Sequence, residues 1–185
     1  MAFRTGVVFA YTLLGGRGAE KPALVANVKS LRDGMAAIGT GQGTLNTMDK
    51  AIVQLENDTA SREDFLKELD AHVSASVPEE GWGPNDTTGP LLQAGAWLAG
   101  TNLVAKAVVK KNDAEAAQKL LARPEVAAFF LKYIRSDEGT AKAGIMTGRV
   151  AEVLKRIEDV SKKPQMEVAD AQVIADATDS LLQLF

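Results

Sequence analysis

Apolar residues recur every three or four positions along most of the chain, which is the period of an amphipathic α-helix. The segment after Pro22 illustrates this spacing with Leu24, Val28, Leu31, Met35 and Ile38. No segment alternates apolar and polar residues with the period of two that a half-buried strand requires. The pattern therefore predicts an all-α bundle.

Glycine and proline divide this pattern into about eight or nine expected helices, because glycine readily ends a helix and proline cannot continue one. The first expected helix ends at Gly15-Gly16. Its apolar face is expected to consist of Phe3, Val7, Tyr11 and Leu14. Later boundaries are expected at Gly39, Pro78, Pro124 and Pro164. The longest loop is expected over residues 77–88.

Polar residues indicate where three of these helices begin. Ser61 precedes Asp64 by three positions, which resembles an N-terminal capping signal. Asn112 stands at the same distance before Glu115 and is expected to cap a short helix. The segment 85–88, Asn-Asp-Thr-Thr, is expected to cap the long helix after it.

The helix expected from Gly89 to Lys111 is the most apolar in the chain. Residues 90–109 would be long enough to cross a membrane. Polar side chains interrupt this stretch at Gln93, Thr101, Asn102 and Lys106. A lysine near the centre of a bilayer costs about 2.5–3.5 kcal/mol. We therefore expect a buried central helix and no transmembrane segment.

The whole chain, residues 1–185, is expected to form one helical domain, because its length lies in the ordinary range for one. A faint internal similarity relates Gly6-Val7-Val8-Phe9-Ala10 to Gly95-Ala96-Trp97-Leu98-Ala99. Two related helical halves are one interpretation, and chance similarity is the simpler explanation of so short a match.

Composition narrows the functional classes. The net charge is -3, and no basic face stands out, so nucleic acid is not an expected partner. Cysteine is absent, which excludes disulfides, thiolate metal ligands and a cysteine nucleophile on this chain. No cofactor-binding motif is present, because the glycine-rich segment 39–44 lacks the preceding strand of a phosphate-binding loop.

His72 is the single histidine, so any histidine-dependent catalytic or metal site on this chain would have to use it. Zinc sites usually need three or four histidine, cysteine or carboxylate ligands. A Ser-His-Asp arrangement would have to use His72, whose neighbours indicate an exposed helix flank. We therefore expect a surface histidine, no metal site and no catalytic residues. The acidic residues near it and on the helix ending at Ser161 are expected to form salt-bridged helix faces.

Small residues on the central helix support two interpretations. Gly95 and Ala99 share a helix face, and small side chains there allow a neighbouring helix to approach closely. Glycine within a helix costs about 0.5–1 kcal/mol relative to alanine, so its presence indicates packing or binding. Close packing around Trp97 is the simpler interpretation. The alternative is a ligand pocket lined by Trp97, Asn102, Gln93 and Tyr11, since such mixed surroundings suit a small apolar ligand.

The same helix carries a resemblance. Its Gly95-Ala96-Trp97-Leu98-Ala99-Gly100 segment, together with its flanks, is similar to a glycine–tryptophan helix of uncharacterised helical proteins from Gram-negative bacteria. The expected order of elements over residues 3–109 also resembles theirs. Many of those proteins are exported or lipid-anchored, so the resemblance implies an all-α fold and an envelope location. It implies no chemical activity, and this chain lacks a cysteine for lipid attachment.

Together these features favour a non-enzymatic binding or scaffolding protein of the bacterial cell envelope with an unidentified protein partner. One alternative is a carrier of a small apolar ligand beside Trp97, and another is a cytoplasmic helical adaptor. The first residues loosely imitate a signal peptide, but Arg17 occupies a position where a cleavage site would be small and neutral. We expect them to form a structural helix.

Overall fold

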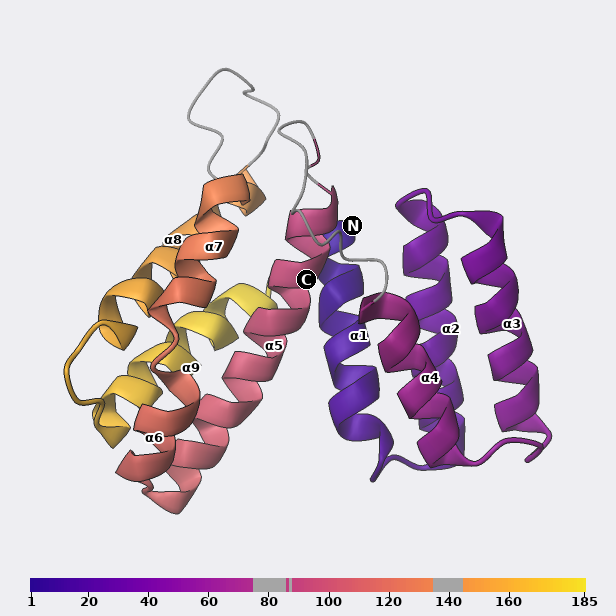
Figure 1. Cartoon of the computed structure of the whole chain (residues 1–185), viewed down its shortest axis with the longest axis horizontal. Helices are drawn as coiled ribbons and strands as arrows, with labels where there is room; N and C mark the ends of the chain where they lie inside the picture. The colour runs from indigo at the N-terminus through magenta and orange to yellow at the C-terminus, as the bar shows by residue number, and fades with distance from the viewer. Residues whose placement is uncertain (75–85, 87, 135–144) are drawn as a thin grey trace. The chain divides into compact units, whose positions relative to one another are not determined.

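The computed structural model describes residues 1–74, 86, 88–134 and 145–185. Within these ranges the chain forms nine α-helices and no strand, which confirms the all-α prediction (Figure 1). The helices are α1 (Ala2–Gly16), α2 (Lys21–Ala37), α3 (Gln42–Glu56), α4 (Arg62–Ser74), α5 (Thr88–Lys111), α6 (Ala114–Leu121), α7 (Pro124–Ile134), α8 (Ile145–Ser161) and α9 (Val168–Leu182). The expected loop over residues 77–88 lies almost entirely outside the described residues.

Two of the three predicted helix starts are confirmed. At the start of α4 the backbone N–H of Asp64 donates to the hydroxyl of Ser61 at 3.1 Å. At the start of α5 the carboxylate of Asp86 accepts from the backbone N–H groups of Thr88 and Gly89 at 2.9 and 3.0 Å. Each acceptor satisfies donors that the first turn of a helix leaves unpaired.

The predicted cap of α6 is wrong by one residue. Asp113, not Asn112, is the N-cap, and its carboxylate accepts from the backbone N–H of Ala116 at 2.9 Å. Asn112 has a φ of 51° and follows the last residue of α5. Asparagine tolerates this left-handed conformation, so it ends one helix while its neighbour begins the next.

The chain divides into two compact units, Met1–Trp97 and Leu98–Phe185. The expectation of one domain over residues 1–185 stays a prediction, because compact packing units need not be separate domains. The boundary falls between Trp97 and Leu98 inside α5, so a continuous helix and not a loop joins the two units. The sequence therefore carries none of the linker signals that mark a domain boundary.

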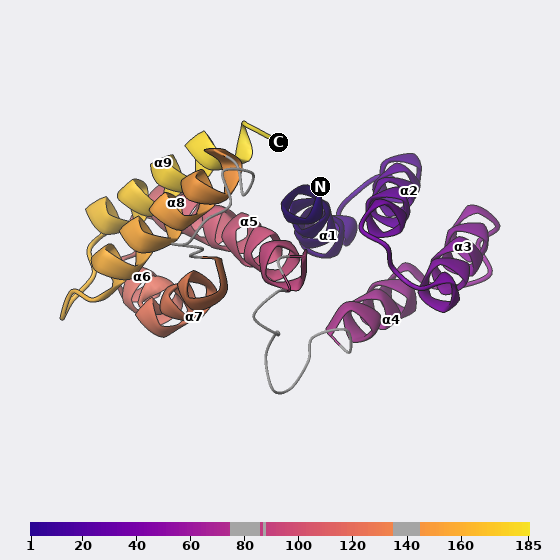
Figure 2. The same ribbon diagram turned by 90° about the horizontal axis from the view of Figure 1, so that it is seen from above.

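The first unit contains α1 to α4 and the beginning of α5. Successive helices run in opposite directions, and α4 contacts both α1 and α3 (Figures 1 and 2). Short connections favour this up-and-down order. The buried apolar side chains of the unit include Leu24, Val28, Leu31, Leu45, Ile52, Phe65 and Leu69.

Helix α1 differs from the single apolar face that the sequence predicts. Phe3 and Val7 are buried as expected, but Tyr11 and Leu14 are 38% and 58% exposed. The buried surface of α1 instead extends around the helix and includes two threonines, Thr5 and Thr12. A strict apolar-face argument fails here because small and hydroxyl-bearing side chains can also be buried.

The buried threonines of α1 keep their hydrogen bonds within the helix. The hydroxyl of Thr12 donates to the carbonyl oxygen of Val8 at 2.7 Å, so its burial leaves no unpaired donor. Thr5 lies against Gly34 of α2, where an added Cβ would stand 2.6 Å from the threonine hydroxyl. Glycine at this position thus allows α2 to approach α1.

Helices α1 and α5 also approach closely, at two glycines. A Cβ added to Gly6 would lie 1.9 Å from the carbonyl oxygen of Leu92. A Cβ added to Gly95 would lie 2.2 Å from the carbonyl oxygen of Phe3. Each glycine therefore faces the residue three positions before the other glycine. The packing interpretation of the small residues in α5 is confirmed at Gly95.

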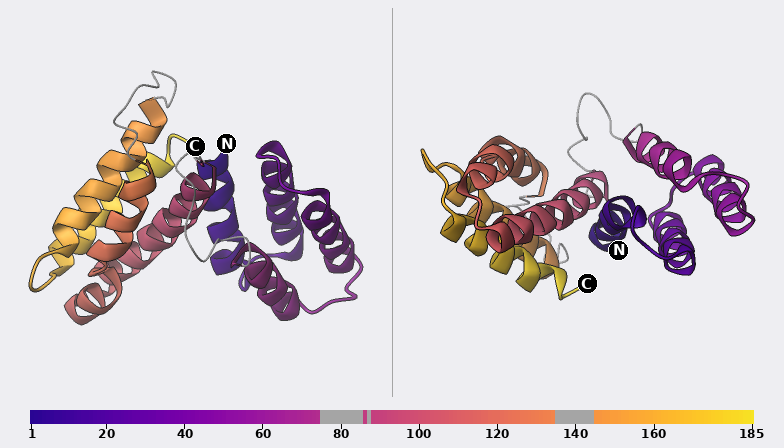
Figure 3. Two further views of the ribbon diagram at one scale, coloured as in Figure 1. Left: turned by 45° about the horizontal axis from the view of Figure 1, so that its top comes forward. Right: turned by 90° about the horizontal axis from the view of Figure 1, so that it is seen from below.

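The second unit contains the remainder of α5 and the helices α6 to α9. Helix α8 packs against α7 and α9, and α6 packs against α9 (Figure 3). Its buried apolar side chains include Leu121, Phe130, Ile134, Val150, Leu154, Ile157, Ile174 and Leu181. Glu158 of α8 pairs with Lys155 and Lys162, which confirms the salt-bridged face predicted for this helix.

Candidate functional site

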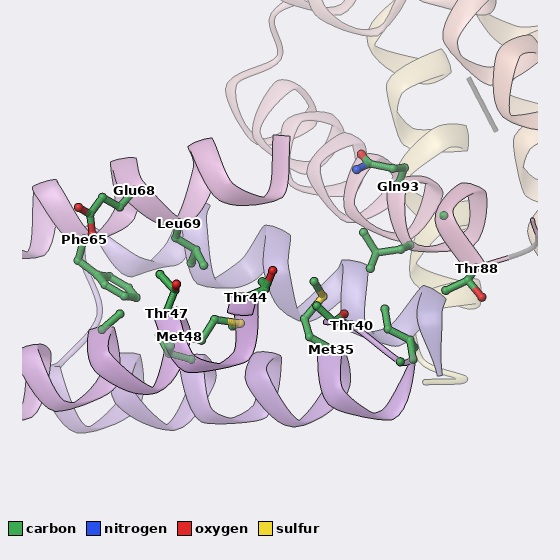
Figure 4. A pocket seen from close by; sticks show the side chains of 16 residues that line it. Met35, Thr40, Thr44, Thr47, Met48, Phe65, Glu68, Leu69, Thr88 and Gln93 are labelled. Carbon is green, nitrogen blue, oxygen red and sulfur yellow. The ribbon is translucent and has the colours of Figure 1, made fainter. Parts of the chain in front are cut away.

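A cavity of about 230 Å³ lies within the first unit. Its walls come from α2, α3 and α4 and from the first turns of α5 (Figure 4). Most of the lining is apolar, and this part includes Val28, Met35, Met48, Phe65, Leu69 and Leu92. All six are buried side chains of the unit's core, so the cavity is an extension of that core.

The turn between α2 and α3 shapes one side of the cavity. Gly39 has a φ of 83°, a left-handed conformation that glycine adopts without strain. The backbone N–H of Thr40 donates to the carbonyl oxygen of Met35, and that of Gly39 donates to Ala36, both at 3.1 Å. This pair of bonds is a Schellman motif, which ends α2 and turns the chain so that Thr40 lines the cavity.

Polar side chains are interspersed with the apolar lining. They are Thr40, Thr44, Thr47, Glu68, Thr88 and Gln93. The hydroxyl of Thr47 donates to the carbonyl oxygen of Gly43 at 3.1 Å within α3. Among the described residues that line the cavity, Glu68 alone has an ionisable side chain. The site therefore combines an apolar body, several neutral hydrogen-bonding groups and one carboxylate.

Both methionines of the cavity suit an adaptable binding surface. Met35 and Met48 stand on different helices, α2 and α3, and both line the cavity (Figure 4). The methionine side chain is unbranched and polarizable, so it can fill a cavity in several conformations. An apolar guest can therefore displace these side chains at a small cost.

The structure places one of the four predicted site residues in this cavity. Gln93 lines it, whereas Trp97, one turn further along α5, is not among the described lining residues. Tyr11 is half-exposed on α1 and does not line it either. Asn102 lies in the second unit and is 1% exposed. A pocket shared by all four residues remains a prediction without support from the described geometry.

Asn102 instead joins α5 to α9. Its amide nitrogen donates to the hydroxyl of Thr178 and to a carboxylate oxygen of Asp179, both at 2.8 Å. The same oxygen of Asp179 forms an ion pair with Nζ of Lys106, which lies one turn further along α5, at 2.6 Å. A buried amide with these partners holds two helices in register, which is a structural role.

The surroundings of Asp179 lower the pKa of its carboxyl group. The hydrogen bond from Lys106 is the largest cause, desolvation opposes it, and the hydrogen bond from Asn102 adds to the lowering. Because the folded pKa lies below the ordinary value of 3.8, the unfolded chain binds more protons in this range. The resulting stabilisation is complete above that value and is lost as pH falls through the folded pKa.

We expect Asp179→Asn to reduce the acid sensitivity of the protein, because it removes one of the carboxylates that must be protonated on acidification. The free energy of unfolding should therefore decline less between about pH 6 and about pH 2, an interval that spans the titration of carboxyl groups. Urea unfolding across this pH range measures the effect. Lys106→Met should act in the same direction, since it removes the main cause of the lowered pKa. An unchanged pH dependence in both variants would contradict this role of Asp179.

The cavity residues contributed by α2, α3 and α4 are absent from the sequence-based hypothesis. One signal could have pointed to α3, where Thr44, Thr47, Met48 and Ala51 follow the spacing of a single helix face. Threonine and alanine on a face beside the core leave room that leucine would fill. The other walls carry no comparable local signal.

The described residues contain no group of three or more histidine, cysteine, aspartate or glutamate side chains suited to hold a metal ion. His72 belongs to α4, but its side chain lies outside the described part of the structure, so the surface-histidine prediction stays a prediction. None of the helices described has both the length and the apolar character needed to cross a membrane.

Comparison with known proteins adds no further constraint. No protein-family model, no curated protein and no solved structure matches this chain.

Proposed function

We propose that this chain is a non-enzymatic binding protein that holds a small, largely apolar ligand in the cavity of its first unit. The observation that carries this proposal is the cavity between α2, α3, α4 and α5, with six core side chains in its lining. Its few polar groups could orient a guest, as in typical small-molecule sites. The ligand would thus lie beside Gln93 and not beside Trp97.

The cavity volume limits the size of the ligand. A dry, engineered cavity of about 150 Å³ is large enough to bind benzene. At about 230 Å³ this cavity has room for a correspondingly larger guest, on the order of eight to ten non-hydrogen atoms by the same comparison. An eight-carbon alcohol, n-octanol, is therefore a suitable neutral probe.

The methionine methyl groups provide a direct readout of binding. The chain has five methionines, and two of them, Met35 and Met48, line the cavity. In protein labelled with ¹³C at the methionine methyl groups, n-octanol should shift these two signals. Met1, Met146 and Met166 lie elsewhere and serve as internal references. Assignment needs only Met35→Leu and Met48→Leu. Equal shifts at all five methyl groups, or none at either cavity methionine, would argue against the proposal.

We expect Ala51→Phe to weaken the binding of n-octanol at least about tenfold, which corresponds to roughly 1.4 kcal/mol. Ala51 lines the cavity from α3, so a phenyl ring at this position occupies the space that the ligand would take. The titration of the methionine methyl signals measures the change.

Val53→Phe is the matched control for this variant. Val53 stands on the same helix, is 53% exposed and does not line the cavity. The control should bind n-octanol as the unchanged protein does. If both variants bind equally well, the ligand occupies another place and the proposed site is wrong.

The envelope location is part of the same proposal and rests on the resemblance of the glycine–tryptophan helix. Fractionation of the host cells tests it directly. Recovery of the protein in the periplasmic or membrane fraction supports an envelope binding protein, and recovery only from the cytoplasm favours the alternative of a cytoplasmic adaptor.

A further inference from the structure

The charge distribution of the cavity limits the chemistry of its ligand. Glu68 contributes a carboxylate, and no lysine, arginine or histidine is found among the described lining residues. None of the ion pairs formed among the described residues includes Glu68. A negatively charged guest would meet this carboxylate without a compensating cation, whereas a positively charged guest would complete an ion pair.

The polar side chains of the cavity are spread along its length. In Figure 4, Glu68 and Phe65 lie at one end, and Thr88 lies toward the other end beside the start of α5. Leu69 lies beside Glu68 and Met48 lies further toward the middle of the cavity, and both line it with apolar surface. A guest with its charge at Glu68 can therefore place an apolar chain among the buried side chains.

We infer that the ligand of this cavity is a cationic amphiphile, with a short alkyl chain in the apolar part and an ammonium head at Glu68. This inference rests on the proposed function, because it assigns a chemical class to the ligand of the same site. An ammonium group has three donors, and the hydroxyl of Thr47 and the carboxylate of Glu68 are acceptors at this end of the cavity. A fatty acid of equal length would bind more weakly, because its carboxylate is repelled by the same charge.

Three probes with the same eight-carbon chain test the inference. They are n-octylammonium, n-octanol and octanoate, which differ only in the charge of the head group. Each is titrated at pH 7, where the amine is protonated because alkylammonium groups have a pKa near that of lysine, about 10.4. The shifts of the Met35 and Met48 methyl signals report on binding.

We expect octylammonium to bind more tightly than octanol, and octanoate to bind most weakly, at least about fivefold below octylammonium. An exposed ion pair changes an equilibrium by about two- to fivefold. Because octylammonium is attracted to the carboxylate and octanoate is repelled by it, their affinities should differ by at least that factor. Added salt should reduce the difference between the charged probes, because it screens exposed charges.

Glu68→Gln isolates the charge. This variant should lose the preference for octylammonium over octanol, about two- to fivefold, and should keep its affinity for octanol within twofold. Glu63→Gln is the matched control, because Glu63 lies on the same helix and does not line the cavity. It should retain the preference for the ammonium probe.

The outcomes separate the inference from the proposed function. If octanoate binds as tightly as octylammonium, or if Glu68→Gln keeps the preference, the cationic class is wrong and the binding function stands. If octanol and octylammonium both leave the cavity methionines unshifted, both proposals are overturned. Binding in the expected order, with loss of preference only in Glu68→Gln, supports both.

Discussion

Gly95→Leu should destabilise the first unit by about 3 kcal/mol or more, at or beyond the upper end of the range for overpacked cores. The Cβ alone would lie 2.2 Å from the carbonyl oxygen of Phe3. Because this contact is with backbone, no side-chain rotation can relieve it. The first turn of α1 would have to move away from α5 and expose Phe3, which is buried in the native structure. Urea unfolding followed by circular dichroism measures the loss, and hydrogen exchange locates it in α1 and α5.

Gly95→Ala is the more specific test, because we expect it to lower the free energy of unfolding, whereas alanine in place of glycine usually raises it. Alanine normally stabilises a helix interior by about 0.5–1 kcal/mol relative to glycine. Gly148→Ala in α8 should follow this rule, since a Cβ there meets nothing within 4 Å. Gly95→Ala should instead destabilise. If both variants raise the free energy of unfolding, the close approach of α1 and α5 is absent in solution.

The helices themselves are largely predictable because their signals are local. The spacing of the apolar residues and the caps at Ser61 and Asp86 depend on neighbours within one or two turns, and the structure confirms them. The error at α6 has the same local origin, since Asn112 and Asp113 are both good capping residues. The left-handed conformation of Asn112 decides between them, and that conformation depends on how α5 ends.

The division into two units is less predictable, because its boundary lies within the continuous helix α5. Domain boundaries usually fall in polar or glycine-rich linkers, but here the boundary falls between Trp97 and Leu98 in an apolar helix. The short sequence similarity between residues 6–10 and 95–99 does not follow this division, because Gly6 and Gly95 both lie in the first unit. It marks two helices that meet at Gly6 and Gly95, so it reports on packing as much as on any relationship between the halves.

The candidate site could be predicted only in part, because polar residues close together in a helix can face opposite directions. Gln93 and Asn102 are nine residues apart, which places them on opposite faces at 3.6 residues per turn. Both are polar residues in an apolar stretch, and this shared feature alone suggests a common pocket. The described contacts separate them, since Gln93 lines the cavity and Asn102 binds Thr178. The other walls of the cavity come from helices distant in sequence, which no local pattern on α5 can reveal.

Asn102→Ala should cost the second unit about 2–4 kcal/mol, because it removes buried hydrogen bonds and leaves a small void. The variant deprives Thr178 and Asp179 of the amide donor that joins α5 to α9. Thermal and urea unfolding measure the loss. Binding of n-octanol in the first unit should remain unchanged, because Asn102 does not line the cavity. Weakened binding without lost stability would restore Asn102 as a ligand-binding residue.

Lys106→Ala provides the control, because Lys106 contacts the same carboxylate oxygen of Asp179 from a more exposed position. Its side chain is 51% exposed, so its ion pair is screened by solvent and should contribute less than about 1 kcal/mol. If Lys106→Ala costs as much as Asn102→Ala, the ion pair and not the buried amide joins the two helices. The expected order, with the larger loss for Asn102, follows because removing this buried donor leaves the buried hydroxyl of Thr178 without solvent to replace it.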